Sequence, residues 1–253
     1  MTENAGVRIR WRGHATVEIT DSGTTILTDP VLTARVAHLR RRRGPDPMND
    51  PVRPDAVLLS HLHADHTHLP SLALIANDVP IVVPRGAVDA FAGLRVFGDR
   101  LIEVSAGQDV QLGSVTVRAV PAVHDGRRWR RGPQRAQALG YVVDGTATTY
   151  FAGDTALDPA MAEWVPRCDV ALLPVGGWGP NLGPGHMDPE SAVAAARSVA
   201  ADVSIPIHFG TLWPIGMDPV RPRRFHGPGG EFVRRAEAAG LRAVELAPGD
   251  VFR

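Results

Sequence analysis

The sequence predicts a mixed α/β fold in which β-sheets carry helices on their outer faces. Three observations support this class. Segments with strand character outnumber helical ones, helical segments occur in both halves of the chain, and the 26 Gly and 22 Pro residues are dispersed between short elements. Strands and helices do not alternate strictly, so a simple β-α-β array is not expected.

The strands expected in the first half are short runs of apolar and β-branched residues. A turn at Asp21-Ser22-Gly23 joins the second and third of them as a hairpin. In chain order, the strands are expected at 7–11, 16–20, 25–28, 56–59, 81–83, 101–104 and 115–120.

The second half adds further strands and the two clearest helices. One helix is expected at 189–200 after the N-cap residue Asp188, and the other at 230–239, where Gly240 ends it. Shorter helices are expected at 68–76, 86–92 and 158–165, and further strands at 140–143, 148–151, 170–173, 203–207 and 243–245. The arginine-rich segments 38–54 and 125–138 are expected to be loops.

Length and composition exclude several classes of protein. A chain of 253 residues can bury a large core, so we expect a single domain over 1–253. The 27 basic and 27 acidic residues cancel, which gives no overall attraction to nucleic acid or acidic membranes. The sequence contains no lysine, so lysine-based covalent catalysis is excluded, and its one cysteine excludes both an internal disulfide and a cysteine-based zinc site.

No segment approaches the roughly 18 consecutive apolar residues of a membrane span, and the N-terminus lacks a signal-peptide pattern. We therefore expect a cytoplasmic protein without an integral membrane segment. The sequence contains no pattern that indicates an oligomeric state.

Four histidines and one aspartate lie within residues 60–68, SHLHADHTH, directly after an apolar run. Neutral imidazole is a good metal ligand, whereas protonated imidazoles repel one another. On an extended segment a spacing of two puts His61 and His63 on the same side, and a sharp turn can then direct Asp65 and His66 at a neighbouring point. The set H-x-H-x-D-H therefore indicates a metal site.

Three more potential ligands follow predicted strands. His124 lies in AVPAVHDG, Asp154 in YFAGDT and His208 in IPIHFGT. Each alone could be an ordinary buried or surface polar residue. Together they place metal-binding side chains near the carboxyl ends of several strands, where loops converge around a site.

These motifs resemble those of the metallo-β-lactamase superfamily, and the resemblance covers nearly the whole chain. H-x-H-x-D-H at 61–66 is followed in the family's order by single His, Asp and His residues. Four further segments resemble the branch that contains ascorbate-6-phosphate lactonase and N-acyl phosphatidylethanolamine phospholipase D. They are WRGHATVEI (11–19), ILTDPVL (26–32), GHMDPESAV (185–193) and IPIHFGT (205–211).

The resemblance implies a four-layer αββα sandwich with a dinuclear metal centre at one edge. It assigns His61, His63 and His124 to one metal, Asp65, His66 and His208 to the other, and Asp154 to a bridge between them. A carboxylate suits the bridge because two nearby cations need an anion between them. A metal-bound hydroxide is then expected to attack a phosphoester or a lactone-type small molecule. Asp65 could also orient the nucleophilic water or accept its proton.

Two departures from the family narrow the expected chemistry. The main dizinc β-lactamases have cysteine where this chain has Asp154, so β-lactam hydrolysis is not expected. Diiron relatives usually have glutamate in place of His63, which disfavours oxygen chemistry. Zn²⁺ is the expected metal and Mn²⁺ the second choice, because imidazole and carboxylate ligands suit both.

Several neighbouring residues have two interpretations each. His186 precedes the helix at 189–200 and could donate a proton or contact a phosphate, or could simply pack there. Asp29 could accept a hydrogen bond from a ligating imidazole, or be a turn carboxylate. His14 receives no role. The basic loop Arg127–Arg131 could attract an anionic substrate, or be an ordinary solvated surface.

The expected partner is a small, anionic molecule rather than nucleic acid. Two alternatives stay open: a phosphodiesterase or nuclease of the same superfamily, and a noncatalytic metal-binding protein on the same scaffold. Specificity is expected to depend on four loops, which are 38–54, 125–138, 176–187 and 212–229.

Overall fold

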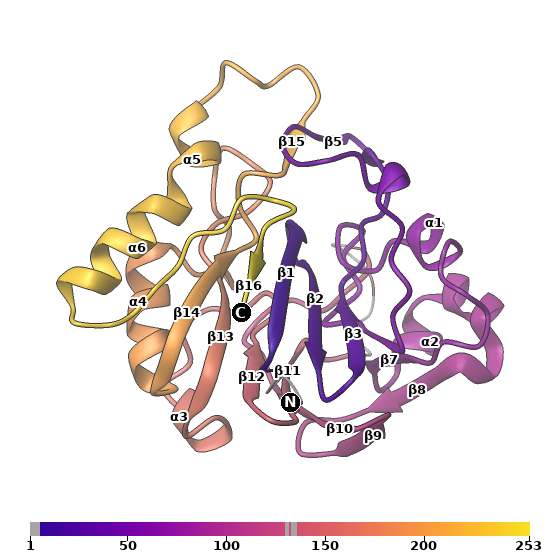
Figure 1. The fold of residues 1–253 in the computed structure, drawn as a ribbon. Helices are drawn as coiled ribbons and strands as arrows, with labels where there is room; N and C mark the ends of the chain where they lie inside the picture. The colour runs from indigo at the N-terminus through magenta and orange to yellow at the C-terminus, as the bar shows by residue number, and fades with distance from the viewer. Residues whose placement is uncertain (1–5, 130–131, 133–135) are drawn as a thin grey trace.

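Two large β-sheets form the centre of the computed structural model, which describes residues 6–129, 132 and 136–253 (Figure 1). The first sheet has the order β16 (Val251–Phe252), β1 (Arg8–Gly13), β2 (Thr16–Asp21), β3 (Thr24–Thr28), β6 (Ala56–Leu58), β7 (Ile81–Pro84) and β8 (Leu101–Val104). The second has the order β14 (Ala201–Ile207), β13 (Cys168–Pro174), β12 (Thr148–Phe151), β11 (Leu139–Asp144), β10 (Val115–Pro121) and β9 (Asp109–Leu112). A small third sheet joins β15 (Leu212–Pro214), β5 (Leu39–Arg41) and β4 (Arg35–Val36).

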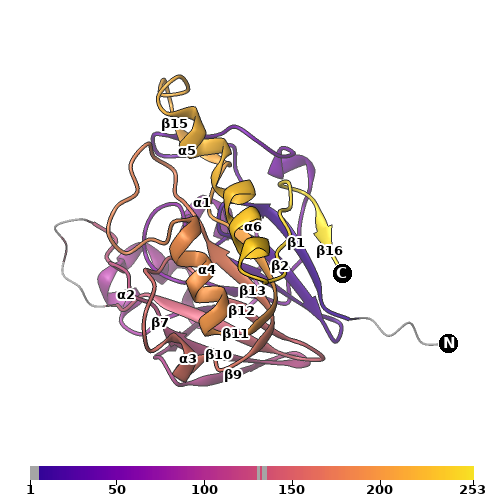
Figure 2. The ribbon, with the colours of Figure 1, turned by 90° about the vertical axis from the view of Figure 1, so that its left-hand side faces the viewer.

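Helices cover the outer faces of the two large sheets. In chain order they are η1 (Pro47–Asn49), α1 (Leu69–Leu72), α2 (Ala87–Ala90), η2 (Ala92–Arg100), α3 (Met161–Trp164), α4 (Pro189–Ser198), α5 (Pro222–His226) and α6 (Pro228–Ala238). α4 and α6 contact each other and pack on β14, with α4 also touching β13, as the side view in Figure 2 shows. α1 and α2 lie on the opposite side of the molecule (Figure 1). The predicted αββα sandwich is therefore confirmed.

The buried residues alternate along the strands of the first sheet, because successive side chains point to opposite faces. Ile26 of β3 and Leu58 of β6 belong to the core between the sheets. Their neighbours Leu27 and Val57 belong to a second core, together with Leu72 of α1. Parallel strands that are covered on both faces read as continuous apolar runs, which is how these segments appear in the sequence.

Most predicted strands are present, with ends within two residues of those expected. The predicted strand at 243–245 was wrong, since Ala243 forms only an isolated bridge with Ser204. The helix α4 begins where it was expected, and Asp188 and Ser191 cap it reciprocally. The short helices predicted at 68–76, 86–92 and 158–165 each contain only four α-helical residues.

Two segments that were expected to be loops contain regular structure. Residues 38–54 include β5 and η1, and residues 212–229 include β15 and α5. β5 and β15 pair with each other, with Leu212 opposite Arg41. Such short strands depend on a partner that is distant in sequence, so local pattern does not predict them. The described part of 125–138 contains neither helix nor strand, as expected.

Strand direction brings the ends of the two sheets to one rim. β3, β6, β7 and β8 run parallel, and so do β12, β13 and β14. β1 and β3 are both antiparallel to β2, so β1 runs in the same direction as β3. In the same way β10 runs in the same direction as β12, because both are antiparallel to β11. The carboxyl ends of strands from both sheets therefore meet at the upper edge in Figure 1. Among the described residues, no helix is both long and apolar enough to cross a membrane.

Candidate metal centre

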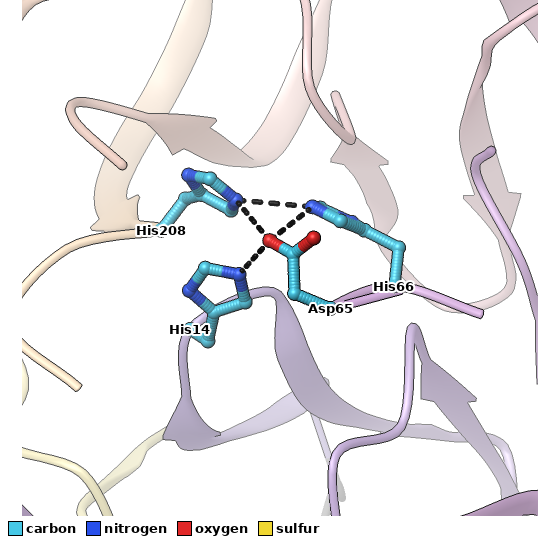
Figure 3. Close-up of side chains that lie close together, drawn as sticks. All are labelled: His14, Asp65, His66 and His208. Atoms are coloured by element: carbon cyan, nitrogen blue, oxygen red, sulfur yellow. Dashed lines mark hydrogen bonds and ion pairs between the residues drawn. The ribbon is translucent and has the colours of Figure 1, made fainter. Parts of the chain in front are cut away.

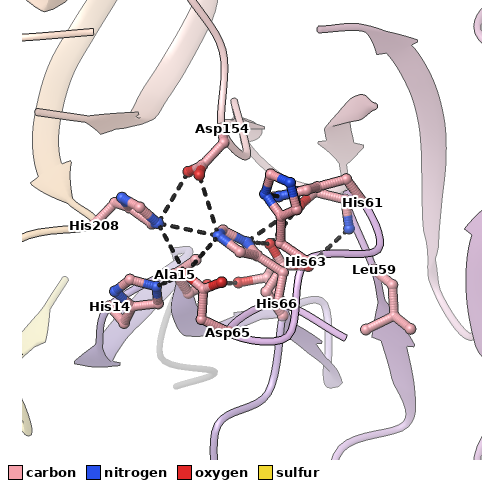
Figure 4. A network of polar contacts seen from close by, with 12 residues as sticks. His14, Ala15, Leu59, His61, His63, Asp65, His66, Asp154 and His208 are labelled. Carbon is pink, nitrogen blue, oxygen red and sulfur yellow. Dashed lines mark hydrogen bonds and ion pairs between the residues drawn. The ribbon is translucent and has the colours of Figure 1, made fainter. Parts of the chain in front are cut away.

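Six strand ends deliver the polar side chains of the site. The residues that follow β1, β3, β6, β10, β12 and β14 are respectively His14, Asp29, the segment 61–66, His124, Asp154 and His208. Figure 4 shows most of these side chains pointing toward a common centre. All seven residues predicted to bind metal lie in this cluster, which has two halves.

The first half consists of His61, His63 and His124. The Nδ1 atom of His63 lies 2.9 Å from His61 Nε2 and 3.2 Å from His124 Nε2. Four ligands that each lie about 2.0–2.1 Å from a tetrahedral zinc ion are separated from one another by roughly 3.3 Å. The three nitrogen atoms are thus spaced as ligands of one cation, and they are the set predicted for the first metal.

The second half consists of Asp65, His66 and His208, with His14 beside them (Figure 3). The Nε2 atoms of His66 and His208 lie 3.0 Å apart, and Asp65 Oδ2 lies 3.5 Å and 3.8 Å from them. Asp154 faces the same pair, with Oδ2 3.2 Å from His66 Nε2 and Oδ1 3.1 Å from His208 Nε2. Its Oδ1 atom accepts no hydrogen bond from the described residues.

Asp154 is also the contact between the halves. The Asp154 carboxylate lies close to His124 and also to the Nε2 atoms of His66 and His208. This position between the two sets is the one predicted for the bridging carboxylate.

The hydrogen-bond partners of the rings decide where their protons lie. His66 Nδ1 lies 2.7 Å from the carboxylate of Asp29, and His208 Nδ1 lies 3.1 Å from the carbonyl of Gly176. Both partners only accept, so each Nδ1 carries a proton, and the Nε2 atoms are the ones left to bind a cation. The two Nε2 atoms therefore face each other, and a cation between them stabilises this arrangement when it replaces any proton they carry.

The same reasoning applies to the first half. The carbonyl of Gly185 accepts from His124 Nδ1 at 2.7 Å. Ser60 donates its hydroxyl proton to Asp29 at 2.6 Å, so its oxygen accepts from His61 Nδ1 at 2.9 Å. The Nε2 atoms of His61 and His124 consequently present lone pairs to the centre. The donor set fits divalent cations in both halves.

Buried negative charge is concentrated around His66. Asp29 Oδ2, Asp154 Oδ2 and Asp65 Oδ2 lie 2.7, 3.2 and 3.5 Å from its nitrogen atoms, and these side chains are 0%, 2% and 8% exposed. Within the described residues, the ion-pair partners of these carboxylates are all histidines. Burial opposes protonation of His66, but the carboxylates raise its pKa well above the usual value. The position therefore attracts positive charge, which a metal ion can supply.

The pKa shifts of three other candidate ligands, His61, His124 and Asp154, favour the protonation states that bind metal. Burial and the neighbouring imidazoles lower the pKa of His61 well below 6.5, and burial lowers that of His124 to about 4. Burial alone raises the pKa of the Asp154 carboxyl, but His208 and His66 outweigh it and hold that pKa well below its usual range. Neutral imidazoles and ionised carboxylates are the forms that act as ligands.

The segment 61–67 makes the sharp turn that the sequence predicted. The amides of His66 and Thr67 both donate to the carbonyl of His63, at 3.1 and 2.8 Å. Arg128 holds this turn from outside, because its Nη1 donates to the carbonyls of Leu62 and Thr67 at 3.0 and 2.8 Å. The guanidinium also lies 4.2 Å from the ring centre of Phe91.

The sequence did not predict that Arg128 bonds this turn. The contact weakens the hypothesis that the basic loop Arg127–Arg131 attracts an anionic substrate. Arg127 is also occupied, since it pairs with Asp125 at 2.6 Å. Neither side chain is available to attract an anionic substrate in the way suggested for this loop. Arg130 and Arg131 lie outside the described residues.

Three further residues contact the candidate ligands in the structure. Asp29 bonds a candidate ligand, as one of its two interpretations proposed. His186 lies next to Asp154, with Nε2 3.3 Å from Oδ2, and its side chain is 20% exposed. His14, which received no role from the sequence, is buried with Nε2 2.7 Å from Asp65 Oδ2. Two features of the sequence could have indicated a role for His14: it follows Gly13, and it stands near the end of a predicted strand.

Comparison with known proteins supports the same family. The family model described as β-lactamase superfamily domain matches residues 24–209. A UPF0173 metal-dependent hydrolase from Methanopyrus kandleri is 30% identical over 259 residues, which cover 97% of this chain and 99% of that protein.

Two solved structures show similar folds. Igni18, a metallo hydrolase from Ignicoccus hospitalis, has a TM-score of 0.73 and 22% identity, with 98% of each chain covered. CmlA, a diiron β-hydroxylase from Streptomyces venezuelae, has a TM-score of 0.69 and 20% identity, covering 98% of this chain and 54% of CmlA. These two proteins have different chemistry, so their likeness to this chain shows the fold alone. Since the family model matches most of the sequence and the fold agrees with it, the chain belongs to the metallo-β-lactamase superfamily.

Proposed function

We propose that this chain is a dinuclear metal-dependent hydrolase that acts on a small phosphoester or lactone-type substrate. The observation that carries the proposal is the set of histidine Nε2 atoms that face one another among three buried carboxylates. The hydrolase name of the Methanopyrus kandleri relative, which aligns over nearly the whole chain, supports it.

In the proposed centre, the ligands are the seven residues predicted from the sequence. Two divalent ions held by these residues would acidify a water molecule and polarise an oxygen atom of the substrate's ester or phosphoryl group. Zn²⁺ suits this set of imidazoles and carboxylates, and Mn²⁺ is the alternative. Asp65 and Asp154 supply the negative charge that keeps the cations in place.

His186 is proposed as the proton donor to the leaving group. Its Nδ1 lies 3.2 Å from the carbonyls of both Gly183 and Pro184, and its Nε2 faces the Asp154 carboxylate. Acceptors on both sides favour the doubly protonated ring. Burial lowers the pKa of His186, but the hydrogen bond and charge of Asp154 raise it more. Its partial exposure gives a leaving group access to the proton.

A recess of about 300 Å³ next to the centre has room for a small molecule. The recess begins at Gly176, whose carbonyl accepts from the ligand candidate His208. The exposed residues Arg223 and Arg224 of α5 line the recess, together with the carboxylates of Asp188 and Glu231. Guanidinium groups bind phosphate and carboxylate well, so within this recess the two arginines are the side chains that suit the anionic end of a small substrate.

Metal analysis combined with a substrate screen tests the proposal. Metal-free protein is reloaded with Zn²⁺ or Mn²⁺ and assayed on phosphomonoesters, phosphodiesters, lactones, N-acyl phospholipids and single-stranded RNA. We expect two metals per chain, and a loss of activity of about 100-fold or more in His61→Ala and Asp154→Asn. His226→Ala, an exposed histidine of α5, is the control and keeps its activity.

The outcomes separate the alternatives. Hydrolysis of RNA in place of the small esters favours the nuclease. Two bound metals without hydrolysis of any substrate favour the noncatalytic protein. Full activity in metal-free protein contradicts the proposal itself.

A further inference from the structure

His14 is a buried histidine beside the proposed centre that the ligand set does not include. It follows β1 in the left-handed conformation, with φ +54°, directly after Gly13 with φ +104°. This turn directs the ring inward, where Nε2 lies 2.7 Å from Asp65 Oδ2 (Figure 3). A non-glycine residue in this conformation is uncommon and points to a specific requirement for its position.

The backbone of His14 is tied to the other sheet. Its carbonyl accepts from the amide of His208 at 2.9 Å and from Trp11 Nε1 at 2.9 Å. Its amide donates to Thr211 Oγ1 at 2.9 Å. One residue therefore contacts Asp65 through its ring and His208 through its carbonyl oxygen, and these two ligand candidates come from different sheets.

His14 groups with Asp65, His66 and His208, but its contact with Asp65 makes the ring a donor to that carboxylate. Because the ionised Asp65 carboxylate can only accept, the proton of the neutral ring lies on Nε2, which then has no free lone pair. In the view of Figure 4, His14 lies beside Asp65 and below His208. The Asp65 Oδ2 atom still has a lone pair left to face His66 and His208.

We propose that His14 is a positioning residue for the second cation, because its Nε2–H holds Asp65 Oδ2 in the orientation that completes the set with His66 and His208. The inference rests on the proposed dinuclear centre. A donor that orients a ligating carboxylate typically changes metal affinity by about 10- to 100-fold. The first set lacks contact with this donor, so the affinity of the first site is expected to change little.

Zinc titration of the metal-free protein against a chromophoric chelator tests the inference, with metal per chain counted by mass spectrometry. His14→Leu removes the donor. His14→Gln restores an N–H near the Nε2 position. His14→Asn suits the left-handed backbone but is too short to reach Asp65. His68→Leu is the matched control, because the His68 ring bonds Ser71 at the start of α1 and, among the described residues, contacts none of the candidate ligands by a hydrogen bond.

We expect His14→Leu and His14→Asn to keep one tight zinc and to bind the second about 10- to 100-fold more weakly. His14→Gln and His68→Leu keep both. Wild-type affinity at both sites in His14→Leu or His14→Asn overturns the inference, and so does an equal loss in His14→Gln. Circular dichroism of the metal-free proteins checks folding, and His14→Asn carries the comparison if His14→Leu does not fold. A wild-type protein that binds fewer than two zinc ions contradicts the proposed function instead.

Discussion

Asp29→Asn tests how the structure sets the proton positions in the centre. The Asp29 carboxylate is fully buried and accepts three hydrogen bonds: from the Ser60 amide at 2.7 Å, the Ser60 hydroxyl at 2.6 Å and His66 Nδ1 at 2.7 Å. Its φ is +35°, a conformation that Asn tolerates as well as Asp. The substitution therefore changes the hydrogen bonds while leaving size and backbone preference nearly the same.

The amide can satisfy only part of this arrangement. If its oxygen faces His66, its NH₂ group meets the Ser60 amide, and two donors oppose each other. If its oxygen faces the Ser60 amide, the NH₂ group meets His66 Nδ1, and the His66 proton must move to Nε2. A buried donor left without an acceptor costs about 1–3 kcal/mol, and hydrogen bonds to charged groups contribute about 1.5–3 kcal/mol.

We therefore expect Asp29→Asn to lower the free energy of unfolding of the metal-free protein by about 2–4 kcal/mol. Zinc affinity falls by about 10- to 100-fold, because a proton on His66 Nε2 competes with the metal. Urea unfolding and zinc titration measure the two effects. Asp55→Asn is the control, since exposed Asp55 accepts from the Thr25 amide and its amide replacement can do the same. Unchanged stability and zinc affinity in Asp29→Asn refute the reasoning.

Three further predictions follow from individual contacts. Arg128→Met removes two hydrogen bonds to the 61–67 turn and is expected to lower the free energy of unfolding by about 1–3 kcal/mol and to weaken zinc binding. Arg127→Met, at an exposed ion pair, leaves urea unfolding nearly unchanged. Burial raises the pKa of Asp21, but hydrogen bonds from Thr146 and Ala147 outweigh it and lower that pKa. Its stabilising effect is therefore complete above the ordinary pKa of about 3.9 and is lost as the pH falls through the lower folded value. The stability difference between wild type and Asp21→Asn should shrink below about pH 4, and a constant difference down to pH 2 contradicts this. Removal of metal by a chelator should lower the melting temperature reversibly, and an unchanged temperature argues against bound metal.

The candidate ligands could be predicted because their signal is local. Each follows an apolar strand, and strands that run in one direction bring their carboxyl ends to the same rim. His61 and His63 lie on the same side because side chains two residues apart on an extended segment point in the same direction. The capping of α4 by Asp188 is equally local, since the side chain bonds a residue three positions along.

The supporting residues depend on contacts that leave no local pattern. His14 meets Asp65 only because β1 and β6 end at the same height in one sheet. Arg128 donates to two backbone carbonyls. Every residue has a carbonyl, so the sequence does not mark these partners, and the arginine-rich segment has the composition of a solvated surface loop. The pairing of β5 with β15 joins distant segments in the same way.

The central claim is that seven side chains from separate strand ends hold two cations. Anomalous scattering from zinc-loaded crystals, with data on both sides of the zinc absorption edge, tests it most directly. We predict two peaks, one among His61, His63 and His124 and the other among Asp65, His66 and His208, with the Asp154 carboxylate between them. A single peak, or peaks that these side chains do not surround, contradicts the claim.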